Sequence, residues 1–359
     1  MEEIKCQKRA SLLTAKQKVL ETIKKYNLIQ NGDGLVLGVS GGPDSISMLD
    51  ILNEIRIDKK SNLDFNIVVA HVNHMIREEA IDDQKFVENY CKKIGVEFYS
   101  LSIDIKKIAN NNKIGTEEAG RNARYEFFNE VLNKTNSNKI AIAHNKNDKA
   151  ETIIMNLLRG SGIAGLKGIE PIKNDKYIRP LIECERWEIE NYCKEKNIEA
   201  RIDKTNFENI YTRNKIRNII IPYIEKEFNP NIIQTIDRLS DLVKEEDEYL
   251  CGLVKQKYEE MLLEELKNGN EIQNLKEIVI DLKKFNKEDK VIKSRILLYT
   301  IARLLGSTKG IEKIHIEDII KLCNNNIGNK YLTPNKNIKV LLKNHKIYFI
   351  NQKWASVEL

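Results

Sequence analysis

The sequence lacks the features that would take a chain out of the cytoplasm. No apolar run approaches the roughly 20 residues that a membrane-spanning helix needs. The N-terminal stretch Met-Glu-Glu-Ile-Lys-Cys-Gln-Lys-Arg contains no apolar core of a signal peptide. Internal repeats and low-complexity tails are also missing, so nothing indicates a solenoid or a biased linker. We therefore expect a globular cytoplasmic protein.

Cysteine occurs without any metal-binding or redox pattern. The six cysteines are scattered, and no two form a C-x-x-C pair. Cys184 and Cys193 are nine positions apart, which is not the spacing of a zinc site. We expect ordinary buried or half-buried thiols in a reducing compartment.

The chain is long enough for two domains, each with its own core. It has 359 residues, of which 41% are hydrophobic and 31% are charged, as is typical of soluble globular proteins. The net charge is +6, and lysine heavily outnumbers arginine, so the few arginines stand out. This mildly basic balance permits a nucleic-acid partner without establishing one.

Strand and helix patterns alternate over the first part of the chain. Short apolar runs predict strands, and apolar residues at helical spacing predict helices. The expected strands cover residues 35–39, 65–71, 96–103, 139–143 and 198–202. The expected helices cover residues 11–26, 46–52, 78–93, 116–131 and 149–158. This alternation favours an α/β fold with a mostly parallel, doubly wound sheet.

The pattern changes after about residue 207. Residues 219–266 are predicted to be strongly helical with a break at Phe228-Asn-Pro230, and further helices are expected at 290–305 and 315–323. Two apolar runs on either side of Lys343-Asn-His-Lys346 predict a small hairpin. We expect a first domain over residues 1–210 and a mainly helical second domain over 211–359 with C-terminal strands.

The most informative stretch is Ser40-Gly-Gly-Pro-Asp-Ser45, which lies between a predicted strand and a predicted helix. Gly41 and Gly42 let the backbone approach a ligand closely, and the free N–H groups of a helix start favour an anion. Ser40 and Ser45 add hydroxyl donors. No Gly-Lys-Ser/Thr follows, which excludes the other common phosphate loop, and the G-x-G-x-x-G spacing of dinucleotide sites is absent. The alternative is a tight turn that binds nothing.

This loop resembles the SGGxDS loop of the ATP pyrophosphatase, or PP-loop, family, whose members cut ATP between its α and β phosphates. Further segments narrow the resemblance to the tRNA(Ile)-lysidine synthetases. In chain order these segments are His71–Arg77, Glu118–Phe128, Ala143–Thr152, Leu158–Leu166, Asp203–Asn206 and Arg213–Arg217, the last of which leads to Pro222. The resemblance covers roughly residues 30 to 225 motif by motif and continues more loosely to the end.

The resemblance implies ATP-dependent ligation of free lysine to the wobble cytidine of the tRNA(Ile) with a CAU anticodon. ATP adenylates the C2 oxygen of the base and releases pyrophosphate. The ε-amine of lysine then attacks C2 and AMP leaves, which gives lysidine. The implied ligands are ATP, Mg²⁺, lysine and this tRNA; residues 1–210 become the ATP-binding PP-loop domain and 211–359 a tRNA-contacting domain. The resemblance leaves open whether the chain forms a homodimer.

Other functions also stay open. A tRNA-thiolating enzyme of the same loop family uses paired cysteines or an iron–sulfur cluster, and this chain has no C-x-x-C pair. An amidotransferase-linked synthetase would need a glutaminase domain, and none is visible. A binding module for tRNA or nucleotide that has lost catalysis is supported only by departures from the family pattern at Asn145 and Asn147.

The chemistry and the resemblance together assign the candidate site residues. A lysine ammonium must lose a proton before it attacks, and His144 or Asp148 is the expected acceptor. Arginines three or four apart share a helix face, where they can neutralise phosphates. Glu151 is expected to help hold the site. The catalytic set is Asp44, Asp148, His144, Arg121 and Arg124; the ATP-binding set is Ser40, Gly41, Gly42, Pro43, Asp44, Ser45 and His71; the tRNA-binding set is Arg159, Arg213 and Arg217; and Asp44 is the candidate Mg²⁺ ligand.

Each assignment has a structural alternative. A carboxylate at a helix start can simply cap the helix, a histidine can pack or shape an adenine pocket, and an arginine can pair with an acidic neighbour or lie on a solvated face. The capping alternative applies to Asp44 and Asp148. The packing or pocket alternative applies to His71, His74 and His144. The ion-pair or solvated-face alternative applies to Arg124, Arg213 and Arg217.

The chain departs from the family pattern in two places. Many relatives read His-His-x-Asp-Asp-Gln where this chain reads His144-Asn-Lys-Asn-Asp-Lys149. Asn145, Asn147 and Lys149 thus replace residues that would otherwise be expected in the site. Many relatives also carry a further C-terminal domain, linked to gripping the tRNA acceptor stem, beyond the region that matches the end of this chain. The sequence leaves open whether the short form is natural.

Overall fold

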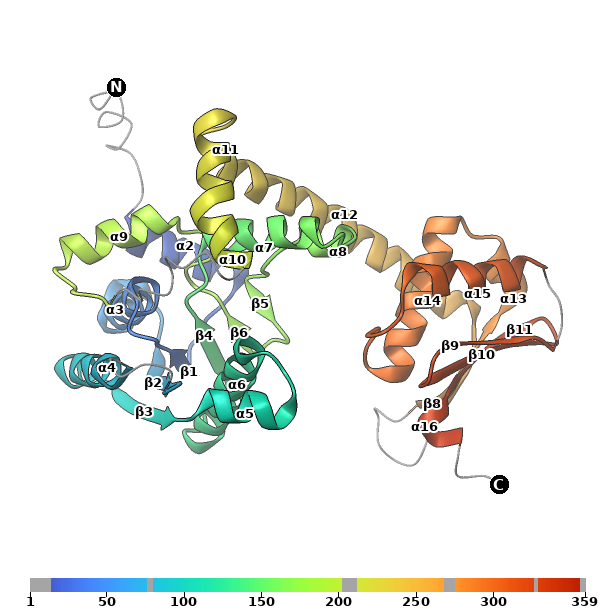
Figure 1. Cartoon of the computed structure of the whole chain (residues 1–359), viewed down its shortest axis with the longest axis horizontal. Helices are drawn as coiled ribbons and strands as arrows, with labels where there is room; N and C mark the ends of the chain where they lie inside the picture. Colours follow the sequence, from blue (N-terminus) through green and yellow to red (C-terminus); the bar gives the residue numbers. More distant parts are fainter. Residues whose placement is uncertain (1–13, 76–79, 202–211, 268–274, 326–328, 356–359) are drawn as a thin grey trace. The chain divides into compact units, whose positions relative to one another are not determined.

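The computed structural model describes residues 14–75, 80–201, 212–267, 275–325 and 329–355 (Figure 1). The predicted Arg77 and Asp203–Asn206 positions lie outside these ranges. The chain forms two compact units, residues 1–243 and 244–359. We expected the first domain to end at residue 210, but the first unit runs further because Ile216, Ile221 and Ile233 pack into one of its apolar clusters. None of the helices in the described ranges has the length and apolar content needed to cross a bilayer.

A six-stranded sheet forms the centre of the first unit, in the order β3-β2-β1-β4-β6-β5. Its strands are β1 (Asp33–Gly38), β2 (Phe65–Asn73), β3 (Glu97–Ser102), β4 (Lys139–Ile142), β5 (Ile172–Lys173) and β6 (Tyr177–Ile178). All neighbouring strands are parallel except β5 and β6. The predicted mostly parallel sheet is confirmed.

The strand expected at residues 198–202 is wrong over its described part, 198–201. The amide of Ile198 bonds to the carbonyl of Cys193 and closes the preceding helix, and the amide of Arg201 bonds to the carbonyl of Gly41 at 3.0 Å. These backbone groups therefore satisfy the helix end and the glycine loop instead of a sheet ladder.

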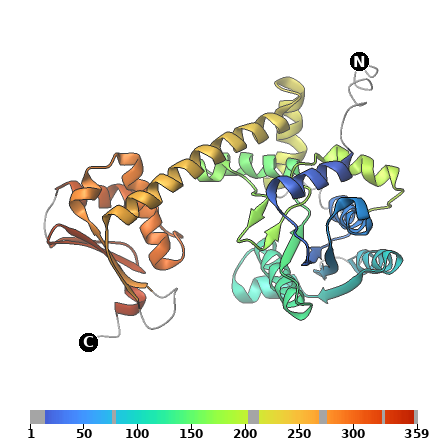
Figure 2. The same ribbon diagram turned by 180° about the vertical axis from the view of Figure 1, so that it is seen from behind.

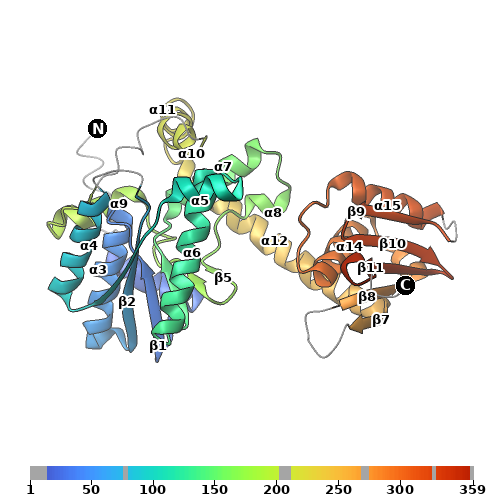
Figure 3. The same cartoon turned by 60° about the horizontal axis from the view of Figure 1, so that its bottom comes forward.

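Helices cover both faces of this sheet (Figure 3). In the first unit they are α2 (Ala15–Tyr26), α3 (Pro43–Ile57), η2 (Lys59–Ser61), α4 (Ala80–Ile94), α5 (Ile105–Asn112), α6 (Thr116–Lys134), α7 (Lys146–Leu158), α8 (Ile163–Leu166), α9 (Arg186–Glu195), α10 (Thr212–Lys215), η4 (Ile216–Ile220), α11 (Ile221–Glu227) and the first part of α12 (Ile232–Met261). Alternate strand residues point to opposite faces. Leu35 and Leu37 therefore pack with α2, α3, α4 and α9, whereas Val36 packs with α6.

The topology brings the predicted site loops to one edge of the sheet. β1 pairs in parallel with both β2 and β4, so all three strands end on the same side. The loop Ser40–Ser45 follows β1, His71 lies in the last part of β2, and His144 follows β4. Ligands of open α/β sheets bind at this carboxyl edge.

The second unit is built on a five-stranded antiparallel sheet in the order β7-β8-β11-β10-β9. The elements are β7 (Leu262–Lys267), β8 (Leu275–Asp281), α13 (Leu282–Asn286), α14 (Lys290–Leu305), α15 (Lys313–Asn325), β9 (Tyr331–Asn335), β10 (Ile338–Lys343), β11 (Lys346–Asn351) and α16 (Gln352–Ala355). The helices α13–α15 lie over one face of the sheet (Figures 1 and 2). The predicted hairpin is confirmed as β10–β11, and the helix predicted to reach residue 266 ends at Met261, where β7 takes over.

Candidate active site

The loop Ser40–Ser45 is shaped by its own side chains. Gly41 has φ +95°, a backbone conformation that side chains disfavour. The hydroxyl Oγ of Ser45 accepts from the amides of Ser40 at 3.1 Å and Gly41 at 3.2 Å, and it donates to the carbonyl of Gly42 at 3.0 Å. Gly42 precedes α3 without a side-chain cap, and Pro43 begins the helix. The start of α3 therefore keeps its N–H groups for an anion.

His71 supports this loop from behind. Its Nδ1 lies 2.9 Å from the carbonyl oxygen of Val39, and the ring is 3% exposed. Burial lowers the pKa of His71 below its ordinary value. In this structure His71 is thus a neutral donor to the backbone at the exit of β1, and its predicted contact with ATP stays a prediction.

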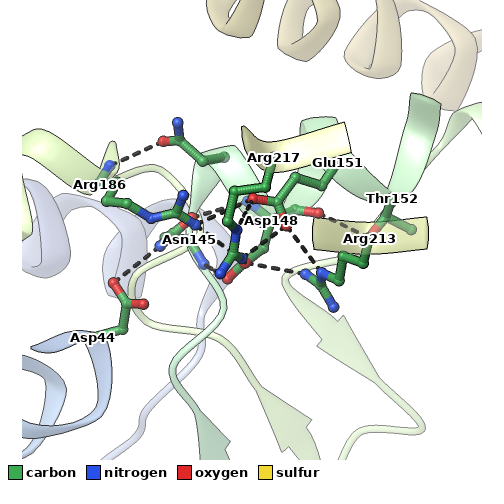
Figure 4. A network of polar contacts seen from close by, with 9 residues as sticks. Asp44, Asn145, Asp148, Glu151, Thr152, Arg186, Arg213 and Arg217 are labelled. Atoms are coloured by element: carbon green, nitrogen blue, oxygen red, sulfur yellow. Dashed lines mark hydrogen bonds and ion pairs between the residues drawn. The ribbon is translucent and has the colours of Figure 1, made fainter. Parts of the chain in front are cut away.

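Asn145 joins the glycine loop to the start of α7. Its Oδ1 accepts from the amide of Asp148 at 2.9 Å and its own amide donates to Asp148 Oδ2 at 3.0 Å, a reciprocal cap. Its Nδ2 donates to Asp44 Oδ1 at 3.0 Å (Figure 4). The contact arises because β1 and β4 are parallel neighbours, with Gly38 opposite Ile142, so that α3 and α7 start side by side.

Asp148 and Glu151 form a buried pair of carboxylates on one face of α7 (Figure 4). They are 6% and 1% exposed. Asp148 Oδ1 accepts from Arg213 at 3.0 Å and Arg217 at 2.9 Å. Glu151 accepts from Arg213 Nε at 2.9 Å, from Arg217 Nε at 2.6 Å and from Arg186 Nη2 at 3.2 Å. We call these five residues the carboxylate–arginine cluster.

The charges of the cluster and burial shift the pKa values of two neighbouring aspartates in opposite directions. Burial opposes the ionisation of Asp148, but the positive charges, with Arg213 the largest, outweigh it and hold the pKa of Asp148 below its ordinary value. Burial, reinforced by the negative charge of Asp148, raises the pKa of Asp44 to about 6. Asp148 is therefore a permanent anion at neutral pH, whereas Asp44 is balanced close to its titration range.

His144 and the two arginines of α6 have partners outside this cluster. His144 Nδ1 accepts from Arg179 Nε at 3.2 Å. Arg121 lies over the ring of Tyr125, with 5.0 Å from Cζ to the ring centroid, and Arg124 Nη2 lies 3.4 Å from Nε2 of His74. Within the described ranges neither Arg121 nor Arg124 has an ion-pair partner, so the structural pairing considered for Arg124 is not seen there.

The predicted tRNA-binding arginines fall into two groups. Arg213 and Arg217 belong to the carboxylate–arginine cluster and do not lie on a solvated face. Arg159 is exposed at the far end of α7, roughly 16 Å along the helix from Asp148 at ~1.5 Å per residue. Their contacts with RNA stay predictions.

Several residues of the candidate site were missed by sequence reasoning. Arg179 and Arg186 were not predicted, and the available signal was only that arginines are few in this chain. Asn147 Oδ1 accepts from the amide of Arg186 at 2.9 Å, and Lys149 Nζ pairs with Asp237 at 2.8 Å. The departures Asn147 and Lys149 thus anchor α9 and α12 on α7.

Comparison with known proteins agrees with this arrangement. The chain matches the PP-loop domain over residues 12–224. It is 45% identical over 324 residues to a tRNA(Ile)-lysidine synthase of Clostridium tetani, which covers 90% of this chain and 66% of the relative. It is 42% identical over 346 residues to one of Clostridioides difficile, which covers 95% and 72%. The chain thus spans about two thirds of the length of such relatives.

Among solved structures, the first unit's fold recurs in a U34-tRNA thiolase from Methanococcus maripaludis. The TM-score is 0.51 at 21% identity, with 63% of this chain and 78% of that chain covered. At this identity the likeness concerns the fold alone.

Proposed function

The chain belongs to the PP-loop family and, within it, to the tRNA(Ile)-lysidine synthases, and from this membership we propose that it ligates free lysine to the wobble cytidine of the CAU-anticodon tRNA(Ile) at the expense of ATP. The observation that carries the proposal is the bond between Asn145 and Asp44. It places an anion-binding loop next to a buried pair of carboxylates, as a reaction between ATP and an ammonium-bearing co-substrate requires.

ATP fits the loop side of the site. Its phosphates would lie on the uncapped start of α3, since the amides of Ser40 and Gly41 already donate to Ser45. Mg²⁺ in proteins is held by one or two carboxylates together with substrate phosphates. Within the described ranges no cluster of three acidic, histidine or cysteine side chains forms a metal cage, and Asp44 offers a single hard carboxylate, so the residues fit a phosphate-bound Mg²⁺. The ion, when bound, would neutralise charge on the phosphates.

Lysine fits the carboxylate side of the site. Asp148 stays negative at neutral pH and is joined to Asp44 through Asn145, so we expect these two aspartates to bind the α- or ε-ammonium group of the amino acid. Because Arg186, Arg213 and Arg217 hold Asp148 ionised, its chemistry favours binding a cation over removing its proton.

The tRNA would supply the base whose C2 oxygen attacks the α phosphorus of ATP, with pyrophosphate as the leaving group. Nitrogen of lysine then bonds to C2, the C2–O bond breaks, and AMP leaves with the oxygen. We expect the cations Arg121 and Arg124, which no described carboxylate neutralises, to bind the phosphates or the adenylate. A cytoplasmic location follows from this substrate.

The test is a pyrophosphate-release assay with CAU-anticodon tRNA(Ile), ATP and lysine, run beside incorporation of labelled lysine. We expect release that requires this tRNA and label at the wobble base. Asp44→Asn should abolish turnover, whereas Asp175→Asn, outside the site, should not. ATP binding without lysine incorporation would refute the proposal, and labelled sulfur entering the tRNA would indicate thiolation instead.

A further inference from the structure

Arg179 is a buried arginine that the proposed chemistry does not use. It directly follows β6, and Ile178 of β6 pairs with Ala141 of β4, so Arg179 and His144 leave the sheet at the same edge. Arg179 is 5% exposed. Its amide donates to the carbonyl of Pro171 at 3.0 Å and its guanidinium donates to the carbonyl of Glu170. The side chain is therefore fixed at both ends.

The remaining contact of Arg179 determines the state of His144. Arg179 Nε donates to His144 Nδ1 at 3.2 Å. A guanidinium has donors only, so Nδ1 must accept with its lone pair, and a neutral ring then carries its proton on Nε2. We propose that Arg179 is a positioning residue that fixes His144 as the neutral Nε2–H tautomer, so that His144 acts in the site as a hydrogen-bond donor and not as the acceptor of the lysine proton.

The charges around His144 support the neutral form. Burial lowers the pKa of His144 to about 4, against the attraction of Asp148 on α7 and with the repulsion of Arg179, Arg213 on α10 and Arg121 on α6. Between pH 6 and 8 the ring is therefore uncharged. A ring with so low a pKa is also a poor base for an ammonium group, because efficient proton transfer needs a pKa near the working pH.

The Nε2–H group has no partner among the described residues. A neutral donor suits an oxygen that gains negative charge during the reaction, such as a phosphate oxygen in the adenylation step. Which reaction this oxygen belongs to rests on the proposed function, but the tautomer does not.

His71 provides an internal reference for the measurement. Its Nδ1 lies 2.9 Å from the carbonyl of Val39, and a carbonyl can only accept, so this ring carries its proton on Nδ1. The two histidines are therefore expected to show opposite tautomers in the same spectrum.

The first experiment records long-range ¹H–¹⁵N spectra of the full chain, labelled on its five histidines, between pH 5.5 and 8, and needs no activity. The signal of His144, identified by its loss in His144→Gln, should show one Nε2–H tautomer throughout. In Arg179→Met it should become a mixture of the two neutral tautomers, because Nδ1 loses its donor while burial still holds the pKa below its ordinary value. Arg238→Met, at an exposed arginine of α12, should leave it unchanged. An Nδ1–H tautomer or an imidazolium in the wild-type chain at pH 7 would overturn the proposal even if Arg179→Met fails to fold.

The second experiment compares two substitutions of His144 in the pyrophosphate-release assay. Glutamine places an N–H donor near the position of Nε2, whereas asparagine places it near Nδ1. We expect kcat to fall about 10- to 100-fold more in His144→Asn than in His144→Gln, the range of one hydrogen bond to a charged group. Equal loss in both would overturn the donor role. Absence of lysine incorporation by the wild-type enzyme would refute the proposed function and leave the tautomer measurement standing.

Discussion

Replacing Glu151 by glutamine tests whether the carboxylate–arginine cluster holds the first unit together. Glu151 is 1% exposed and accepts from three arginines at 2.6–3.2 Å. Glutamine keeps the volume and one acceptor oxygen but removes the charge, so Arg186, Arg213 and Arg217 are left with Asp148 alone. Removing one partner of a buried ion pair costs about 3–5 kcal/mol. Because glutamine retains packing, we expect a loss of about 3 kcal/mol.

The assay is urea unfolding of Glu151→Gln followed by tryptophan fluorescence. A Trp354→Phe background makes Trp187 of α9 the reporter, so the signal belongs to the first unit. When the same fluorescence signal is followed on heating, the melting temperature should fall by about 6–12 °C, at ~2–4 °C per kcal/mol for a unit of this size. Glu190→Gln, an exposed position on α9, is the matched control and should change stability by less than about 0.5 kcal/mol. A loss below about 1 kcal/mol in Glu151→Gln would show that the cluster is not a buried ion pair.

Three further predictions concern the surroundings of the cluster. Asn145→Ala should lower the free energy of unfolding by about 1–2 kcal/mol, since it removes the cap of α7, and an unchanged unfolding midpoint would contradict the role of the cap. The same substitution should shift the pH dependence of turnover, because Asp44 loses its amide donor. Burial disfavours the charge of Glu183, but its bonds to Tyr26 and Lys25 and the charge of Lys146 lower its pKa to about 2, so the stabilisation that it gives is full above pH ~4.3 and is lost as the pH falls towards 2. Glu183→Gln should therefore destabilise the protein by at most about 2 kcal/mol at pH 6, after allowance for solvent screening, and progressively less towards pH 3. A difference that stays constant with pH would refute the assignment. Lys149→Gln leaves the half-buried carboxylate of Asp237 with Lys146 alone. We expect urea unfolding to show a loss of about 1–2 kcal/mol, and no loss would mean that this pair is solvated.

Local chemistry explains which parts of the fold could be predicted. The glycine loop and the start of α3 follow from Gly41, Gly42 and Pro43, whose backbone preferences act within the loop itself. The strand expected at 198–202 failed because the amide of Ile198 closes the end of α9 and that of Arg201 bonds to Gly41. The segment Leu262–Lys267 reads as helix by propensity, but pairing with β8 makes it a strand, since tertiary contacts override weak local preferences.

Partners far apart in the sequence explain what could not be predicted in the site. Arg213 and Arg217 were expected to share a face, and they do, but their carboxylate partners on α7 lie 62–69 positions earlier. Likewise, the tautomer of His144 depends on Arg179, which is 35 positions away. Periodicity identifies the face of a helix that is used; only the sheet order identifies what that face meets.

The departures at Asn145 and Asn147 gave the only sequence support for a binding module without catalysis, and Lys149 departs from the family pattern in the same segment. In the structure each of them bonds to an element of the site: Asn145 to Asp44 and to the start of α7, Asn147 to the start of α9, and Lys149 to α12. The buried amide of Asn145 lies between Asp44 and Asp148, and burial, reinforced by the negative charge of Asp148, raises the pKa of Asp44. Holding these groups together costs free energy in the resting protein. A cation or a metal-bound phosphate between them would offset part of that cost, so the three departures are compatible with the proposed enzyme.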